Sequence, residues 1–489
     1  MSALSTGAVL GLTVGCVGTL LLCLAVVLRR RGLFHWTSMG FWAWAAFGLY
    51  FVANPLAYWL GGDLGRYEVR LALAGGSARG LWILLVTLLG IITFFISYLR
   101  SSASPVAWNL HAGQRQFTPL MLHIMLLVGL FSFYSLVVYR ANLVDVERTI
   151  VDGRFVGETT GYQNTGYTFW FGPAVMLLLA NRRAARASGW LTIALFIILA
   201  LPRGWARFAI VSIVLAASMA VTLRSGRRWP SPVLLAGLLL LASVLQIRGH
   251  ADWSLSEVGQ GLAANASQLP ARNIEVLASS DTAMLASWYL WSYLDDNVTG
   301  YDYGLPAINY TLLGWIPSRF LPQKYFLIDW LRANQGPIPA SAQRLLRGSK
   351  ATLLGDFYGN GGVLAVIVLA ALAGLALRKI DGMLRRDNPT LVQATGIAWL
   401  SMMWIIWGST LTWALVRIGS MSLPVLLLWF FAPKQDSPPG NSRPVASVSQ
   451  KAADGARSDW PTALLQASSE NEAQVMKPSP SMRSWPWTK

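Results

Sequence analysis

Charged residues are scarce in this chain. Only 12% of its 489 residues are Asp, Glu, Lys or Arg, whereas 54% are hydrophobic and 23 are tryptophan. Soluble domains have about a quarter charged residues, because they must present a polar surface to water. The composition therefore excludes a soluble globular protein and indicates an integral membrane protein.

Cysteine and histidine are rarer still. The two cysteines, Cys16 and Cys23, lie in the first apolar run, where a packing role is expected because a redox or metal site needs polar neighbours. The four histidines are spread along the chain without the spacing of metal ligands: His35, His111, His123 and His250. We therefore expect no metal site and no cofactor.

Several common motifs are missing as well. The sequence contains no Walker, Rossmann or hydrolase-elbow motif and no internal repeat. An ATP-driven pump needs a phosphate-binding loop, and a soluble-type hydrolase needs a nucleophile on a tight turn. Neither class of protein is expected here.

Acidic residues are outnumbered by basic ones, which gives a formal net charge of +17. Most basic residues stand in short clusters between apolar runs, and this placement follows the positive-inside rule for cytoplasmic loop ends. Nucleic acid is therefore not an expected partner. The clusters are Arg29 to Arg31, Arg182 with Arg183, Arg227 with Arg228, Arg378 with Lys379, and Arg385 with Arg386.

The apolar runs predict an all-α polytopic membrane protein with about eleven transmembrane helices of roughly 20 residues each. They lie near 7–28, 37–60, 80–98, 118–139, 165–180, 188–202, 205–223, 231–247, 354–377, 390–408 and 411–432. With the cation clusters inside, the N-terminus is expected to be periplasmic and the C-terminus cytoplasmic. The first run is expected to be a retained span rather than a cleaved signal peptide.

This topology divides the chain into four parts. Residues 1–247 are expected to hold roughly the first eight spans, and residues 354–432 the last ones. Residues 248–353 form one long periplasmic loop, and residues 433–489, poor in aliphatic side chains, are expected to be a disordered cytoplasmic tail.

The long loop contains semi-apolar pieces at 284–294 and 312–326 that are too short or too broken by proline to span, so we expect short interfacial helices there. Within 317–350 only Asp329 stands against six cations. An acidic partner is therefore expected, and phosphate suits arginine best because its oxygens accept a bidentate pair of hydrogen bonds. Lipid headgroups are the alternative partner.

Charged residues within spans are costly and usually mark function. Arg207, Asp356 and Arg417 all fall near the expected external side of their spans. Arg203 precedes Arg207 by one helical turn and is expected on nearly the same helix face. The alternative interpretation is that the long side chains reach for the interface and one arginine neutralises the aspartate.

Three sequence segments carry a resemblance to a known family. They are GWARFAIVSIVLA (204–216), IPSRFLPQK (316–324) and ATLLGDFYGNGGVLAVIVLAALAG (351–374). The order of a span that opens on an arginine, a long external loop with a Pro-x-x-x-x-Pro-x-Lys element, and a Gly-rich span start resembles Wzy-type oligosaccharide repeat-unit (O-antigen) polymerases. These proteins are relatives of the O-antigen ligases.

The resemblance implies a glycosyltransferase of the bacterial inner membrane that joins undecaprenyl-diphosphate-linked oligosaccharides at the periplasmic face, without a metal. Arg319 and Lys324 would bind the diphosphate, and Arg207 is a second candidate, with Arg203 and Arg417 nearby in the expected topology. Asp356 would be the catalytic base, because residues 350–352 read Lys, Ala, Thr where the ligases have a histidine. This difference favours a polymerase over a ligase. A chain-length regulator and a flippase would be partners, besides the lipid bilayer.

Two other membrane functions remain as alternatives. A lipid-linked sugar flippase or secondary transporter would be expected to have two similar halves and polar residues on broken helices at the membrane midplane. An outer-face acyl- or phosphoethanolamine-transferase would need a soluble-type catalytic domain or a metal cluster. The sequence itself indicates none of these features.

Overall fold

The computed structural model describes ten continuous segments of the chain and a few isolated positions. The segments are 6–56, 77–101, 171–180, 182–200, 207–238, 301–313, 320–334, 352–385, 390–408 and 411–431, with 127, 150–151, 154–155 and 316 in addition. Within them the chain is almost entirely helical. β1 (Ile150–Val151) and β2 (Arg154–Phe155) pair antiparallel as a minimal hairpin.

The described helices follow the apolar runs. They are α1 (Thr6–Arg30), α2 (Met39–Gly48), the π-helix η1 (Leu49–Ala53), α5 (Ser77–Arg100), α8 (Phe171–Leu179), α9 (Arg183–Ala200), α10 (Arg207–Ser225), α15 (Leu305–Ile308), the π-helix η4 (Asn309–Leu313), α16 (Phe326–Asn334), α18 (Leu353–Met383), α19 (Thr390–Ser401), α20 (Met403–Ile406) and α21 (Leu411–Phe431). The runs expected at 118–139 and 231–247 extend beyond the described residues. The all-α class is confirmed, while the number of spans stays a prediction.

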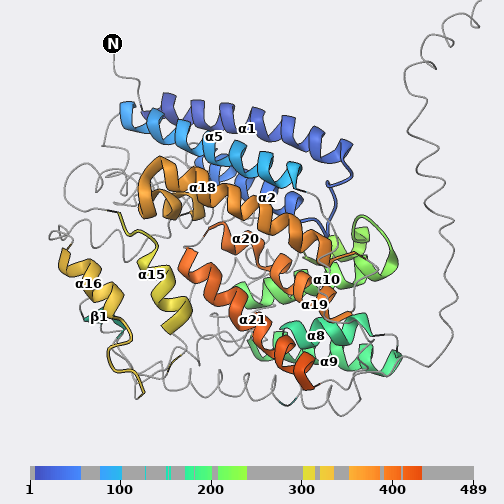
Figure 1. Cartoon of the computed structure of the whole chain (residues 1–489). Coiled ribbons are helices and arrows are strands. Elements are labelled where there is room, and N and C mark those ends of the chain that lie inside the picture. Colours follow the sequence, from blue (N-terminus) through green and yellow to red (C-terminus); the bar gives the residue numbers. More distant parts are fainter. Residues whose placement is uncertain are drawn as a thin grey trace, which may run out of the picture. The chain divides into compact units, whose positions relative to one another are not determined.

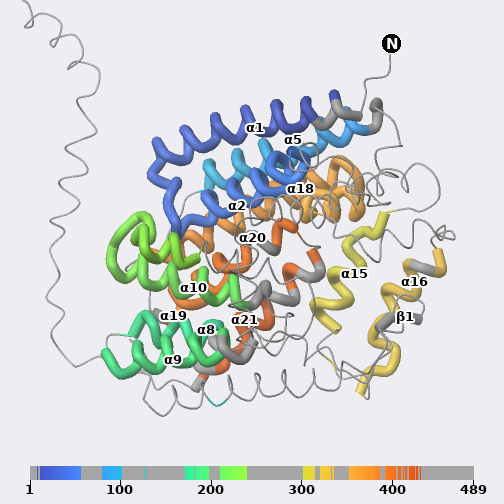
Figure 2. The backbone as a smooth tube through the Cα atoms, turned by 180° about the vertical axis from the view of Figure 1, so that it is seen from behind, coloured from blue at the N-terminus to red at the C-terminus, as the bar shows by residue number. Residues whose placement is uncertain are grey.

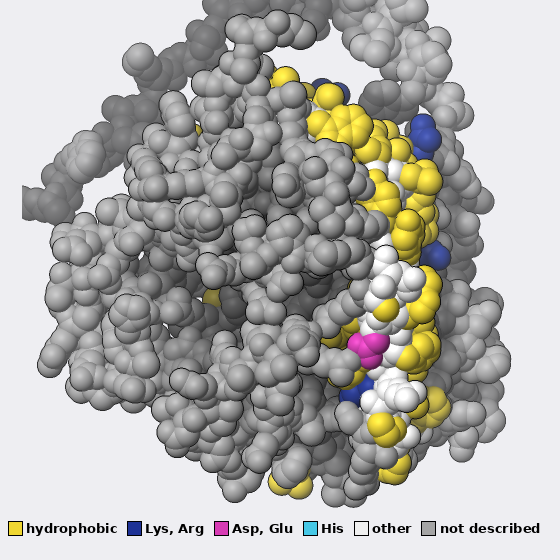
Figure 3. Space-filling model, turned by 90° about the vertical axis from the view of Figure 1, so that its left-hand side faces the viewer, with side chains coloured by type: hydrophobic (Ala, Val, Ile, Leu, Met, Phe, Trp, Pro, Cys, Tyr) yellow, Lys and Arg dark blue, Asp and Glu magenta, His cyan; other side chains and the backbone are white. Residues whose placement is uncertain are grey.

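Three of these helices are long and apolar enough to cross a membrane. Their apolar stretches cover Gly11–Arg30, Gly80–Arg100 and Leu353–Met383. Large aliphatic side chains project outward from such helices, and Leu22 and Leu364 are 68% and 71% exposed. In Figure 3 most of the described surface in view is hydrophobic, with few charges in it. A surface of this kind suits lipid rather than water, which supports a membrane protein.

α5 and α18 run side by side in the same direction and make the most extensive contact between two described helices (Figure 1). Glycine makes this approach possible. A Cβ on Gly374 would lie 2.4 Å from the Phe94 carbonyl oxygen, and one on Gly90 would lie 3.0 Å from Leu354. The backbones can therefore approach as closely as small-residue helix pairs do in membranes.

α2 lies beside this pair (Figure 2). It runs in the opposite direction, because its first residue, Met39, bonds to Asp381 near the end of α18, and it brings aromatic rings into the core. The ring of Phe47 lies 5.8 Å from that of Phe94 and 4.5 Å from that of Trp407, between their centroids. All three side chains are almost completely buried. These rings join α2 and α5 to the segment that follows α20.

Three of the basic clusters meet at one end of the helix bundle, which we call the cation end. The Arg31 guanidinium donates to the Leu99 carbonyl at 3.0 Å, and Arg378 Nε donates to the Ser101 carbonyl at 3.3 Å. α1, α5 and α18 therefore all finish at the cation end. These directions are the ones that the alternating topology requires, and the side of the membrane on which the end lies stays a prediction.

The end of α10 joins the same region through the turn after α1. The Trp36 backbone N–H donates to the Arg228 carbonyl at 3.0 Å, and the Trp36 indole donates to Ser218 Oγ at 2.9 Å. His35 lies in this turn, where burial and then the nearby charge of Arg228 lower its pKa. An imidazole with a lowered pKa stays neutral, so it adds no charge to the cluster.

The described part of the long loop, 301–313 with 316 and 320–334, consists of short helices. α15 contacts both α16 and α21, and η4 contacts α21. On α16 the side chains of Ile328 and Leu331 are buried, whereas Phe326 and Trp330 are exposed. Short helices of this kind fit the expected interfacial elements. The piece at 284–294 and the tail at 433–489 lie outside the described residues.

Candidate functional site

The carboxylate of Asp356 lies in the first turn of α18, where the sequence places it. The helix begins after Thr352, whose hydroxyl accepts the Gly355 N–H at 3.1 Å as an N-cap. Asp356 Oδ2 accepts the backbone N–H of Leu411 at 2.8 Å, at the first residue of α21. The carboxylate therefore joins the starts of two helices.

Asn360 holds the same carboxylate from one turn further along α18. Its amide nitrogen donates to the Asp356 carbonyl at 2.6 Å and lies 3.4 Å from Asp356 Oδ2. Its amide oxygen accepts the Gly304 N–H at 2.7 Å, which ties the loop to the helix. Both bonds to the carboxylate go to Oδ2, and no described residue donates to Oδ1. Oδ1 is therefore the oxygen that can accept a proton from another molecule.

α18 is broken directly after Asn360. Gly361 has φ 166° and ψ 34°, and Gly362 has φ 64° and ψ −152°, so neither is helical. Only glycine adopts the Gly362 conformation readily, and a Cβ there would lie 2.6 Å from the Tyr301 hydroxyl oxygen. The sequence predicts a Gly-rich span start here, and the run Gly-Asn-Gly-Gly is the signal that could also have indicated the break.

A second carboxylate, that of Asp302, lies near Asp356, and it was not among the predicted site residues. Its backbone N–H donates to the Gly359 carbonyl at 2.9 Å, and that of Tyr303 donates to the Asn360 carbonyl at 3.2 Å. The carboxylates of Asp302 and Asp356 are close enough to repel each other electrostatically. The loop and the broken helix thus bring two acidic groups together.

Lys324 is buried, with only 7% of its surface exposed. Its ammonium donates to the Ile316 carbonyl at 3.1 Å and lies 5.2 Å from the ring centroid of Tyr325. The bond spans the segment that holds Pro317 and Pro322, so the lysine has a local structural role that the sequence analysis did not foresee. No described acidic side chain forms an ion pair with it, and its other N–H groups can still donate.

The remaining predicted site residues are placed only in part. Arg207 begins α10, and Arg417 lies within α21, but their side chains are outside the part that the structure describes. Arg203 and Arg319 lie outside the described residues altogether. An ion pair between Asp356 and an arginine thus remains a prediction.

Lys324 and Asp356 belong to elements that contact one another. The 301–304 segment bonds to α18, α15 packs against α21 and α16, and α16 directly follows the Lys324 turn. Trp82, near the start of α5, donates to the Tyr358 hydroxyl at 3.3 Å. We call this region the Asp356 end. It is opposite the cation end, because α18 runs from one to the other.

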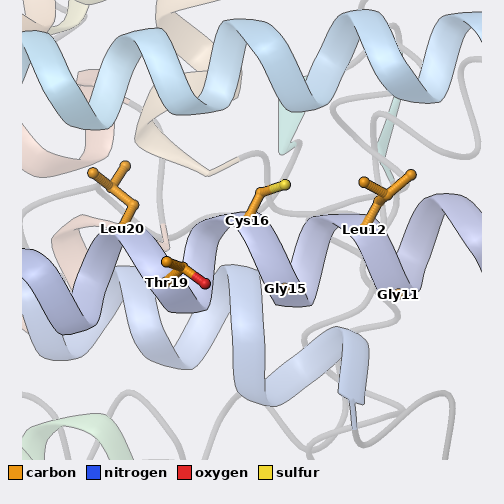
Figure 4. Close-up of a pocket in the computed structure, with 6 residues that line it drawn as sticks. All are labelled: Gly11, Leu12, Gly15, Cys16, Thr19 and Leu20. Atoms are coloured by element: carbon orange, nitrogen blue, oxygen red, sulfur yellow. The ribbon is translucent and has the colours of Figure 1, made fainter.

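A shallow groove lies on α1. It is lined by Gly11, Leu12, Gly15, Cys16, Thr19 and Leu20 (Figure 4). It contains no charged side chain, and Cys16 also packs against the hydrophobic core. In the described segments, no three His, Cys, Asp or Glu side chains are grouped as metal ligands.

Comparison with protein families, with characterised proteins and with solved structures finds no match for this chain. The functional interpretation therefore depends on the geometry of the Asp356 end and on the three sequence segments.

Proposed function

We propose that this protein is a glycosyltransferase that joins undecaprenyl-diphosphate-linked oligosaccharide repeat units into a surface polysaccharide at the periplasmic face of the bacterial inner membrane. One observation carries the proposal. Among the described residues, the bonds that hold the Asp356 carboxylate go to Oδ2, which leaves Oδ1 as the proposed proton acceptor, at the opposite end of the bundle from the basic clusters. The resemblance of three segments to repeat-unit polymerases supports the same function.

In the proposed reaction a hydroxyl of the acceptor sugar attacks C1 of the donor sugar. The bond from C1 to the diphosphate oxygen breaks, and its electron pair stays on the leaving diphosphate. The hydroxyl proton passes to Asp356 Oδ1 as the new glycosidic bond forms. Direct attack of this kind inverts the configuration at C1.

The leaving diphosphate gains negative charge as the bond breaks, so cations placed beside it stabilise the transition state more than the substrate. Arg319 and Lys324 are the proposed ligands, with Arg207, Arg203 and Arg417 as further ones. Lys324 is a largely buried residue without a described acidic partner, which supports this role, because a cation shielded from water is favoured when an opposite charge compensates it.

The broken helix favours transport as a second candidate function. Secondary transporters bind ions where a helix is interrupted, and α18 is interrupted at Gly361 and Gly362 close to Asp302 and Asp356. The break lies near the start of α18 rather than at its middle. Two alternatives to a polymerase therefore remain. One is a flippase for lipid-linked sugars, and the other is a ligase-like transferase.

The orientation in the membrane is part of the proposal. Residues 248–353 are expected to be periplasmic, and 433–489 cytoplasmic. A cysteine in place of Ser267 should react with an impermeant thiol reagent in whole cells, and one in place of Ser437 should not. The reverse pattern would place the Asp356 end in the cytoplasm and remove the proposed site.

Deletion of the gene distinguishes the candidate functions. Surface polysaccharide would be separated by size on a gel. Loss of long chains with survival of single repeat units identifies a polymerase. Complete chains that stay on their lipid carrier identify a ligase, and repeat units that stay inside the cell identify a flippase.

A further inference from the structure

The π-helix η4 exposes apolar side chains and buries polar ones. Tyr310 and Leu312 are 38% and 66% exposed, and Ile308, the last residue of α15 directly before η4, is 46% exposed. Asn309 is fully buried, and the hydroxyl of Thr311 is buried as well. A surface helix of a soluble protein has the opposite arrangement. In a membrane protein this pattern is typical of a segment with lipid on one side and a polar interior on the other.

The buried polar groups of η4 are unpaired. Neither the amide nitrogen nor the amide oxygen of Asn309 has a hydrogen-bond partner among the described residues, and neither does the Thr311 hydroxyl. Folded proteins pair nearly all buried polar groups, because an unpaired one loses its bonds to water without compensation. An asparagine in this position is explained if a group outside the polypeptide bonds to it.

η4 belongs to the elements that form the Asp356 end. It contacts α21, whose first backbone N–H holds Asp356. On its exposed side the Tyr310 ring lies 5.6 Å from the ring of Tyr325, between centroids, and Tyr325 is the residue beside Lys324. The helix that holds the unpaired amide therefore contacts the helix whose start binds the proposed base, and it contacts the residue beside the proposed diphosphate ligand.

We propose that Asn309 binds hydroxyl groups of a sugar in the lipid-linked oligosaccharide. The proposal rests on the proposed function and adds a sugar-binding residue to it. A side-chain amide offers N–H donors and a carbonyl acceptor, which match neighbouring hydroxyls of a sugar ring. Being uncharged, it suits the sugar rather than the diphosphate. The exposed apolar residues of η4 would meanwhile face the lipid.

Thermal unfolding of the purified protein in detergent tests this role. The probe is the repeat-unit oligosaccharide, released from its lipid carrier by mild acid. For Asn309→Leu we expect an unfolding temperature without oligosaccharide equal to or above that of the parent, because the unpaired amide is removed. We expect binding of the oligosaccharide to weaken about tenfold or more. Thr311→Val, a change of similar shape, should weaken it in the same direction.

Asn334→Leu is the matched control. Asn334 is an exposed asparagine on α16, in the same loop, and its amide bonds to the Trp330 carbonyl within that helix. This variant should bind the oligosaccharide like the parent. If Asn309→Leu lowers the unfolding temperature and still binds like the parent, Asn309 is a structural residue and the proposal is wrong. A parent protein that the oligosaccharide does not stabilise also overturns it.

Chain elongation, measured separately with lipid-linked repeat units, distinguishes this proposal from the proposed function. If the parent protein binds the oligosaccharide through Asn309 but elongates no chains, Asn309 is a sugar-binding residue and the protein is not a polymerase. If Asn309→Leu elongates chains at the parental KM, the protein is a polymerase but Asn309 does not bind the sugar.

Discussion

Two aspartates lie in α18, one near each end, and their carboxylates are held differently. Asp381 uses both oxygens. Its Oδ1 accepts the Met39 N–H at 2.7 Å, its Oδ2 accepts the Tyr98 hydroxyl, and Arg378 Nη1 lies 3.8 Å from Oδ2. In the described part of the chain, Asp356 is bonded only through Oδ2, and the charged group that acts on it is the carboxylate of Asp302.

The difference fits a structural role for Asp381 and the proposed role of Asp356 as a base. Asp381 links three helices, since its partners come from α2, α5 and α18 itself, and an opposite charge compensates its own. No oxygen remains for a substrate. Asp356 is oriented as firmly but keeps one oxygen available, which is the arrangement that a general base needs.

The largest effect on stability is expected at Asp381. Asp381→Ala removes the carboxylate that accepts the Tyr98 hydroxyl and compensates the Arg378 charge, and breaking a buried pair in this way costs about 3–5 kcal/mol. The unfolding temperature in detergent should therefore fall strongly. Asp329→Ala, on the exposed side of α16, is the control and should change it little. An unchanged unfolding temperature for Asp381→Ala would contradict the structural role.

A comparable effect, on turnover instead of stability, is expected at Arg319. If this side chain grips the diphosphate, Arg319→Lys should slow turnover about a hundredfold, nearly as much as Arg319→Ala, because an ammonium cannot form the bidentate pair. The rates would be compared in a reconstituted assay with lipid-linked repeat units at equal protein levels. Parental activity of Arg319→Lys would instead identify the segment as a membrane anchor, since headgroup attraction depends on charge alone.

Smaller effects are expected from substituting two glycines of α18, Gly374 in its second half and Gly362 at the break near Asp356. Gly374→Ala brings a Cβ within 2.4 Å of the Phe94 carbonyl oxygen, so we expect a loss of about 1–3 kcal/mol in stability. Gly362→Ala strains the break by about 1 kcal/mol and displaces the Tyr301 side chain. The polymerisation rate of Gly362→Ala should fall by more than this loss of stability explains. If instead Gly362→Ala polymerises like the parent, the break is not part of the site.

The smallest effect is expected in the tail. Truncation after Pro433 removes residues that are remote from the proposed site in the expected topology, so chain length and yield should stay at the parental level. The polysaccharide from cells with the truncated protein would be compared on a gel. Shortened chains at a normal protein level would show that the tail binds a partner, with a chain-length regulator as the first candidate.

The helices and the position of Asp356 could be predicted because they depend on local sequence. An apolar run at 80–98 became Ser77–Arg100, and the run at 354–377 became Leu353–Met383. Hydrophobic length alone determines such spans. Asp356 lies in the first turn of its helix because Thr352 caps it, and capping also acts over a few residues.

The partners of Asp356 could not be predicted, because they are distant in the sequence. The bond from Gly304 to Asn360 and that from Leu411 to Asp356 depend on how the loop and α21 fold onto α18. Apolar periodicity contains no information on such contacts. The break at Gly362 could have been predicted from the sequence, because a glycine pair beside an asparagine is a weak helix former. The hydrogen bond from Lys324 to the Ile316 carbonyl could not be predicted either, because the charge of a lysine indicates an anionic ligand and not a bond to the backbone.

We propose that Asp356, and not Asp381, takes the proton in chain elongation. The direct test is a reconstituted assay that follows product length from lipid-linked repeat units for the parent, Asp356→Asn and Asp381→Asn. Asp356→Asn should unfold at the parental temperature but elongate about 10²–10⁴-fold more slowly. Asp381→Asn should elongate at a temperature where it remains folded. If Asp356→Asn elongates chains at the parental rate, Asp356 is not the base.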